Sequence, residues 1–199
     1  MPPPLLPLLL VVGSFLAGSV PFGVLFARAR GVDLRAVGSG NIGATNAARA
    51  LGRKVGVLVF LCDAAKGTLP VLLALRLMPP TEAGEAVVAA CGAAAFLGHL
   101  YPPWLGLRGG KGVATAFGVF LALSPTAALV SIALFAVCYG AFRVSSIGSL
   151  AGATLFPFTL WRLGTRPAFL ALALVVWALI VWRHRGNIDR LLRRQESRR

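Results

Sequence analysis

Residues Gly38 to Arg49, GSGNIGATNAAR, have the composition of a site that binds an anion. Glycine has no Cβ, so backbone N–H groups can approach a ligand closely at Gly38, Gly40 and Gly43. Neutral donors come from Ser39, Asn41, Thr45 and Asn46, and Arg49 adds a planar guanidinium. Such donors suit a phosphate best. If Gly43 opens a helix, Asn46 and Arg49 follow one and two turns later.

Two other interpretations of this segment remain. GSGNIG matches the dinucleotide-binding pattern G-x-G-x-x-G, but that pattern requires a preceding strand, and here an apolar segment of membrane type precedes it. The segment could also be a flexible turn without a ligand.

A second glycine-rich segment, Gly106 to Gly112 (GLRGGKG), holds Lys111 between glycines. It is not a P-loop, because Leu105 stands at the first glycine position and Gly112 stands where serine or threonine is required. We expect the amides of Gly109, Gly110 and Gly112 to surround the lysine as exposed donors. The alternative is a lysine that only marks the inner end of a membrane helix.

Two further polar clusters complete the candidate site. Ser145, Ser146 and Ser149 lie around a break after Arg143, and Ser146 and Ser149 can share a helical face. Hydroxyls that only satisfy the backbone of a membrane helix are the alternative there. His184 and Asn187, three residues apart, would also share a face.

The remaining buried charges have a structural interpretation. Asp63 and Lys66, at positions i and i+3 of one apolar segment, can neutralise each other. His99 is expected to be structural, hydrogen-bonded at a helix end. The six carboxylates are scattered, so no metal site is expected.

These clusters must be positioned by membrane helices. The chain has 199 residues, 57% hydrophobic and 13% charged, with a mean hydropathy of +0.80, whereas a soluble domain carries about 25% charged residues. The apolar runs are continuous rather than alternating, which favours helices over a barrel. We expect one domain over residues 1–199, an all-α polytopic integral membrane protein with a bundle of seven helices, some of them short or half helices. The seven segments are Leu5 to Ala27, Val55 to Leu77, Ala86 to Leu100, Val113 to Leu123, Thr126 to Phe142, Ile147 to Trp161 and Ala168 to Trp182.

The distribution of charge predicts the orientation. With the N-terminus outside and the C-terminus in the cytoplasm, inner loops hold 16 of the 20 Lys and Arg, and outer loops hold 3. All four polar clusters then lie on the cytoplasmic face. The net charge of +14 is assigned to anionic lipid and anionic substrates, because no nucleic-acid-binding module is present.

Six segments in order resemble the bacterial acyl-phosphate:glycerol-3-phosphate acyltransferases, the PlsY family. They are GSVPFG (Gly18 to Gly23), GSGNIGATNAARALG (Gly38 to Gly52), DAAKG (Asp63 to Gly67), GHLYPPWLGLRGGKGVAT (Gly98 to Thr115), RVSSIGS (Arg143 to Ser149) and HRGNIDRLL (His184 to Leu192). The chain departs from the family in its tail, where a glycine is expected near Arg194, in a G-x-E pattern ending at Glu196.

The resemblance implies a seven-helix enzyme of the bacterial inner membrane, without a cofactor or metal. It would transfer a fatty acyl group from acyl phosphate to the 1-hydroxyl of glycerol 3-phosphate, the first acylation of phospholipid synthesis, giving lysophosphatidic acid and phosphate. Implied partners are both substrates, membrane lipid and the soluble enzyme that makes acyl phosphate. The implied catalytic residues are Ser39, Arg49, Lys111, Ser149, His184 and Asn187. The implied phosphate-binding residues are Gly38, Gly40, Asn41, Gly43, Thr45, Asn46, Gly109, Gly110, Gly112 and Ser146.

Two rival functions belong to other classes. A membrane anion transporter would also need glycine loops and cations, but it should show matched halves and clusters near the bilayer midplane, and no convincing repeat is found. A lipid-binding scaffold would need the basic charge but not the particular Ser, Asn and His residues.

Overall fold

The computed structural model describes residues 5–196, in which helices follow one another and no strand occurs. The helices are α1 (Leu5–Ser19), α2 (Phe22–Arg28), α3 (Ala44–Leu51), α4 (Arg53–Leu77), α5 (Glu82–Leu100), a 3-10 turn (Pro103–Leu105), α6 (Val113–Leu123), α7 (Pro125–Phe142), α8 (Ser145–Arg162), α9 (Pro167–Arg183) and α10 (Arg185–Leu192). The all-α prediction is confirmed, and each of the seven apolar segments is helical. The short segment Val113 to Leu123 has the predicted bounds.

The first apolar segment differs from the prediction of one helix over Leu5 to Ala27. It is interrupted between α1 and α2, at Val20 and Pro21. Proline has no N–H to continue the helical ladder, and it steers the residue before it away from helical geometry. The break leaves the backbone carbonyl of Val20 available, and the Nζ of Lys66 on α4 donates to it at 2.8 Å.

The membrane assignment rests on length and on what the outer faces expose. Within residues 5–196, four helical stretches are long and apolar enough to cross a bilayer: Leu5–Arg28, Arg53–Leu77, Glu82–Leu105 and Pro125–Phe142. A fifth is counted if α9 and α10, bent by 56° at their junction, form one span. Large side chains such as Leu9, Leu69 and Val137 are more than 60% exposed on outward faces, as expected where the surroundings are lipid. The number of crossings and the orientation of the termini stay predictions.

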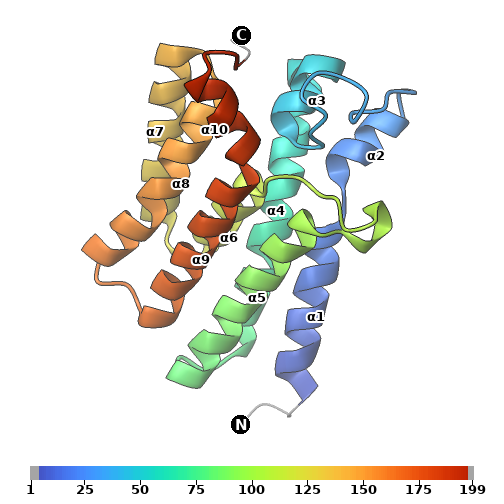
Figure 1. Ribbon diagram of the computed structural model, residues 1–199. Helices are drawn as coiled ribbons and strands as arrows, with labels where there is room; N and C mark the ends of the chain where they lie inside the picture. Colours follow the sequence, from blue (N-terminus) through green and yellow to red (C-terminus); the bar gives the residue numbers. More distant parts are fainter. Residues whose placement is uncertain (1–4, 197–199) are drawn as a thin grey trace.

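The helices pack as neighbouring pairs, with α1 against α5, α4 against α6 and α7 against α8 (Figure 1). A common apolar core, which includes Phe96, Phe120 and Val176, joins α5, α6 and α9. The beginning of α1 lies at one end of the bundle, and α3 and α10 lie at the other (Figure 1). The predicted polar clusters lie just before or within the first turns of α3, α6, α8 and α10, so the fold can bring them to one region.

Candidate active site

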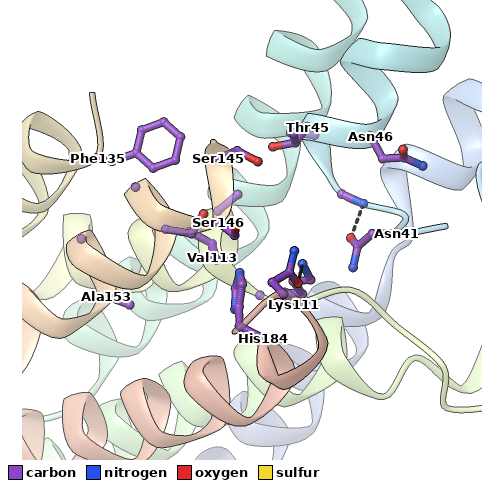
Figure 2. Close-up of a pocket in the computed structure, with 18 of the residues that line it drawn as sticks. Asn41, Thr45, Asn46, Lys111, Val113, Phe135, Ser145, Ser146, Ala153 and His184 are labelled. Carbon is purple, nitrogen blue, oxygen red and sulfur yellow. Dashed lines mark hydrogen bonds between the residues drawn. The ribbon is translucent and has the colours of Figure 1, made fainter. Parts of the chain in front are cut away.

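A cavity of about 660 Å³ lies between α3, α4 and α6 on one side and α7 and α8 on the other, with the α9–α10 junction beside it. Its size is typical of a site for a small molecule. All six residues predicted to be catalytic line it: Ser39, Arg49, Lys111, Ser149, His184 and Asn187. Seven of the predicted phosphate-binding residues also line it: Gly38, Asn41, Gly43, Thr45, Asn46, Gly112 and Ser146. Four distant segments therefore share one cavity, and Figure 2 shows Lys111, His184 and Ser146 converging there.

The loop before α3 is held in shape by Asn46. The Nδ2 of Asn46 donates to the carbonyls of Leu34 and Val37, and its Oδ1 accepts from the backbone N–H of Ser39. Gly43 is at the N-cap of α3, as expected, and its N–H donates to the Oδ1 of Asn41. Asn46 therefore braces the loop, whereas Ser39 and Arg49 are the groups of this segment whose side chains can be offered to a ligand.

Gly38 is required by this geometry. Its φ is +58°, in the left-handed region, and a Cβ there would lie 2.3 Å from the Oδ1 of Asn46. A side chain would therefore displace the amide that holds the loop. Gly40 also has a positive φ, of +66°, but it does not line the cavity, so its predicted contact with phosphate gains no support.

Gly109 and Gly110 do not line the cavity either, and their amides are not exposed donors as predicted. The N–H of Gly109 donates to the carbonyl of Leu100, and that of Gly110 donates to the carbonyl of His99, both at the end of α5. A Cβ on Gly109 would lie 2.0 Å from the His99 carbonyl oxygen, and one on Gly110 would lie 2.2 Å from the His99 ring. These glycines allow the loop to lie directly on α5, which delivers Lys111 to the cavity.

We expect Gly110→Ala to unfold at a temperature several degrees lower than the unchanged protein and to lose most activity, because the methyl group would displace the His99 ring or the loop. Gly140→Ala on α7 is the matched control, since nothing lies within 4 Å of the added carbon. Thermal unfolding in detergent measures both variants. Equal unfolding temperatures for the two variants would contradict this account of the loop.

His184 lies at the junction of α9 and α10, only 2% exposed. Its Nδ1 lies 2.8 Å from the carbonyl oxygen of Ile180. A carbonyl only accepts, so the proton is on Nδ1 and the Nε2 lone pair is available as an acceptor. Burial, followed by the positive charge of Lys111, lowers the pKa of His184 to about 4. The ring is therefore neutral at physiological pH.

Asn187, on the first turn of α10, joins Lys111 to a residue that the prediction did not assign. Its Oδ1 accepts a short hydrogen bond from the Nζ of Lys111, and its Nδ2 donates to the Oε1 of Glu196. Glu196 also accepts from the hydroxyl of Ser146 at 3.1 Å and from the Nε of Arg190 at 2.6 Å. Glu196 and Arg190 line the cavity. The expected G-x-E pattern was the signal that could have identified Glu196.

The electrostatics of this network suit an anionic ligand. Burial lowers the pKa of Lys111 to about 8, against the opposing effect of the Glu196 carboxylate. Burial alone would raise the pKa of Glu196, but hydrogen bonds from Asn187 and Arg190 lower it overall. Glu196 is therefore ionised and holds a cationic cluster together, and an incoming phosphate would further stabilise the charged form of Lys111.

The tail that carries Glu196 turns at Arg194, where the resemblance leads us to expect a glycine. Arg194 has φ +57°, a conformation that costs a residue with a side chain about 1–2 kcal/mol. The departure from the pattern is therefore tolerated with strain, and the backbone still follows the path that a glycine would favour.

We expect Arg194→Gly to slow hydrogen exchange at the amide of Gln195, which donates to the carbonyl of Arg190 across this turn. Relief of strain at φ +57° is the cause. Arg193→Gly is the control, because Arg193 has an ordinary φ of −83°, so glycine there adds only flexibility and should speed exchange. Mass spectrometry of deuterium uptake measures both, and slower exchange in the control alone would contradict the prediction.

Asp63 and Lys66 form the expected pair, with the Nζ of Lys66 2.7 Å from the Oδ1 of Asp63. The Nδ1 of His99 lies 3.7 Å from the same oxygen. Asp63 and His99 also line the cavity. The expected hydrogen bond of His99 is not found, because its buried Nδ1 has no hydrogen-bond partner among the described residues.

The other end of the cavity is apolar. It is lined by Phe60, Val113, Phe117, Ile132, Phe135, Gly148, Gly152, Ala153 and Phe156. On α8, the lining residues from Ser145 to Phe156 recur at helical spacing, so one face of this helix runs from the hydroxyls to the aromatic rings. The eleven residue steps from Ser145 to Phe156 span about 16 Å. The cavity therefore joins a cationic end to a long apolar end.

The described residues hold no cluster of three or more His, Cys, Asp or Glu side chains placed to bind a metal ion. The groups available for chemistry in the cavity are guanidinium, ammonium, hydroxyl, amide, imidazole and the carboxylates of Asp63 and Glu196.

Comparisons with known proteins agree on one family. The glycerol-3-phosphate acyltransferase family model matches residues 8–194. The chain is 51% identical to a glycerol-3-phosphate acyltransferase of Anaeromyxobacter sp. strain K over the whole of both chains. It is 51% identical to that of Myxococcus xanthus over 95% of this chain and 97% of the relative.

Two crystal structures of PlsY, described as an integral membrane glycerol 3-phosphate acyltransferase, have the same fold. The glycerol 3-phosphate form superposes with a TM-score of 0.92 at 44% identity, covering 97% of this chain and 95% of that one. The lysophosphatidic acid form superposes with a TM-score of 0.89 at 43% identity, covering 96% and 94%.

Proposed function

Because the chain belongs to the glycerol-3-phosphate acyltransferase family, we propose that it transfers a fatty acyl group from acyl phosphate to the 1-hydroxyl of sn-glycerol 3-phosphate. It is a multi-pass membrane acyltransferase, and the products are lysophosphatidic acid and phosphate. One observation carries the assignment of residues: Arg49, Lys111 and His184, far apart in sequence, line one cavity that is cationic at one end and apolar at the other.

The cationic end suits two phosphorylated substrates. Arg49 and Lys111 both line the cavity, and Arg190 adds a third positive charge. Guanidinium groups bind phosphate through two parallel hydrogen bonds, whereas Lys111 supplies a compact charge. The hydroxyls of Ser39, Ser146 and Ser149 line the same space and can orient phosphate or glycerol oxygens.

The apolar end suits the acyl chain. Its lining on α8 runs from Gly148 to Phe156, about 12 Å of helix, which is most of the depth of one leaflet of the hydrocarbon core, about 15 Å. Gly148 and Gly152 allow α8 to pack directly against α7. A Cβ at either position would lie within 2.9 Å of a backbone oxygen of α7, that of Phe135 for Gly148 and that of Ser131 for Gly152. The chain would therefore lie between α4 and the α7–α8 pair, with its carbonyl near Ser149.

The chemistry requires positioning more than activation. In acyl phosphate the leaving group is already good, so the hydroxyl oxygen forms a bond to the acyl carbon while the bond from that carbon to the phosphate oxygen breaks. A phosphate oxygen of a substrate takes the hydroxyl proton. Neutral His184 orients the glycerol by accepting a hydrogen bond at Nε2, and Lys111 stabilises negative charge on the departing phosphate.

The topology belongs to the same proposal. The excess of Lys and Arg in the loops that carry the four clusters supports an inner-membrane protein whose active site faces the cytoplasm, with the N-terminus outside. A soluble enzyme that produces acyl phosphate would then supply the donor from the side on which the site opens.

The test is a direct assay of the purified protein in detergent with labelled glycerol 3-phosphate and synthetic acyl phosphate, with acyl-CoA as a parallel donor. We expect lysophosphatidic acid from acyl phosphate only. Equal product from acyl-CoA would contradict the donor assignment. Phosphate uptake by liposomes without any lysophosphatidic acid would favour the transporter instead.

A further inference from the structure

Arg183, the last residue of α9, donates hydrogen bonds to the loop that carries Lys111. Its Nε donates to the carbonyl of Gly110 at 3.1 Å, and one terminal nitrogen donates to the carbonyls of Gly109 and Gly110 at 2.7 and 2.9 Å. Its guanidinium carbon lies 5.9 Å from the ring centre of Tyr101, at the opposite end of the same loop. Arg183 does not line the cavity, so its contacts are made with the loop and not with a ligand.

The same two glycines are held from the other side by α5. Their N–H groups donate to the carbonyls of Leu100 and His99, at 3.0 and 3.2 Å. The peptide groups before Lys111 are thus bonded on both sides, and the Gly110 carbonyl that Arg183 holds belongs to the peptide bond that leads directly into Lys111. Fixing the plane of that peptide fixes the direction in which the lysine leaves the backbone.

The Nζ of Lys111 is held by the same short segment of chain. Asn187, four residues after Arg183, accepts its hydrogen bond, and His184 lies between them. The α9–α10 junction therefore fixes Lys111 at two points, at its backbone through Arg183 and at its tip through Asn187. A displacement of the loop would separate Lys111 from His184 and from any phosphate bound between them.

We propose that Arg183 is a positioning residue for the acyl transfer, which acts by locking the Gly109–Gly110 backbone so that Lys111 meets its phosphate. The inference rests on the proposed role of Lys111 in the function above. A planar guanidinium can donate to two carbonyls at once, whereas a lysine is a single point charge and cannot form the same set of hydrogen bonds.

Arg183 also acts on Lys111 through its charge. Burial is the main cause of the lowered pKa of Lys111, and the positive charge of Arg183 adds to it. Loss of Arg183 should therefore do two things at once: loosen the loop, and move the titration of Lys111 to higher pH.

The experiment compares Arg183→Gln and Arg183→Lys with Arg185→Gln. Arg185 is the matched control, because it is two residues away and exposed, and its contacts are with Trp182. For each folded variant, kcat and KM for glycerol 3-phosphate are measured with acyl phosphate from pH 6 to 10. The pH midpoint of Lys111 modification by an amine-reactive reagent is read by mass spectrometry, which needs no turnover.

We expect Arg183→Gln to lower kcat about 10- to 100-fold and to shift both the alkaline limb of activity and the Lys111 modification midpoint to higher pH. Arg183→Lys should lower kcat less, with a smaller shift, and Arg185→Gln should match the unchanged protein. If Arg183→Gln fails to fold, as judged by gel filtration in detergent, Arg183→Lys decides by the same criteria.

The inference is overturned if the folded Arg183 variants match Arg185→Gln in kcat and in the Lys111 midpoint. It is also overturned if their only defect is a lower unfolding temperature. An inactive unchanged protein would instead reject the proposed function, while the modification midpoints would still decide whether Arg183 controls Lys111.

Discussion

Replacing Lys111 by alanine should lower the rate of lysophosphatidic acid formation about 10³-fold or more. The variant loses the ammonium that the Asn187–Glu196 network holds in the cavity, and no other described side chain occupies that position. Removing one preorganised donor from the site of developing negative charge commonly costs 10²–10³ in rate, and a full charge at a phosphate should cost at least that. The measurement is kcat with acyl phosphate and labelled glycerol 3-phosphate.

The pH dependence of the activity provides a second test of the role of Lys111. Its pKa is lowered to about 8, so the ammonium is present below pH 8 and is lost as the pH rises through that value. We therefore expect the unchanged protein to lose kcat/KM for acyl phosphate above pH 8. Lys111→Arg keeps its positive charge, so it should not show this loss above pH 8. Its kcat should still be lower, because guanidinium and ammonium groups differ in shape. Arg108→Ala, an exposed side chain of the same loop, is the control and should retain normal kinetics. A normal rate in Lys111→Ala would remove the assignment.

Replacing His184 by alanine should lower kcat about 10²-fold or more. The bond from Nδ1 to the Ile180 carbonyl fixes the tautomer, so the variant loses a rigid acceptor for a glycerol hydroxyl at Nε2. Positioned hydrogen-bonding groups of this kind contribute factors of this size. His184→Gln, which keeps an acceptor on a more flexible chain, should retain more activity than His184→Ala.

The lowered pKa of His184 leads to a second prediction, which concerns the pH dependence of kcat. An ordinary histidine would become protonated near pH 6.5, and the acceptor would disappear. Because its pKa is about 4, the neutral form persists above that value, so kcat should show no loss attributable to this ring between pH 5 and 7. An acid limb near pH 6.5 that disappears in His184→Gln would contradict the neutral-acceptor role.

Much of the fold could be predicted because continuous apolar runs have few alternatives. Six of the seven apolar segments each form one helix and the first forms two, and the polar breaks at Ser124 and Arg143 end α6 and α7 where expected. The break at Pro21 was missed because the hydropathy of Leu5 to Ala27 does not change there, whereas the backbone does. For the segment that forms α10, the sequence predicted only that His184 and Asn187 share a helical face, and it did not define the helix, since charged residues dominate its composition.

The candidate site was predicted from residue types. The prediction and the structure differ where a side chain or amide can hydrogen-bond to the backbone as well as to a ligand. Asn46 is a good phosphate ligand in composition, but its amide is taken by the loop that it follows. Gly109 and Gly110 signal a close approach, and sequence alone cannot say whether a ligand or α5 approaches. Glu196 was given no role in the prediction, because its contacts with Asn187 and Arg190 depend on the path of the folded tail.

The contact between Lys66 and the interrupted first helix bears on how the protein enters its membrane. Asp63 and Lys66 lie three residues apart on one helix, so their ion pair can form before any other helix is present, and α4 can cross the translocation machinery as a segment with little net charge at its centre. The remaining donor capacity of the lysine is met by the carbonyl of Val20, which only a broken helix exposes. Docking of the amino-terminal helix thus provides a hydrogen-bond acceptor for a lysine that is already within the membrane. The bundle would therefore assemble in a preferred order, with α4 in the membrane before this contact forms.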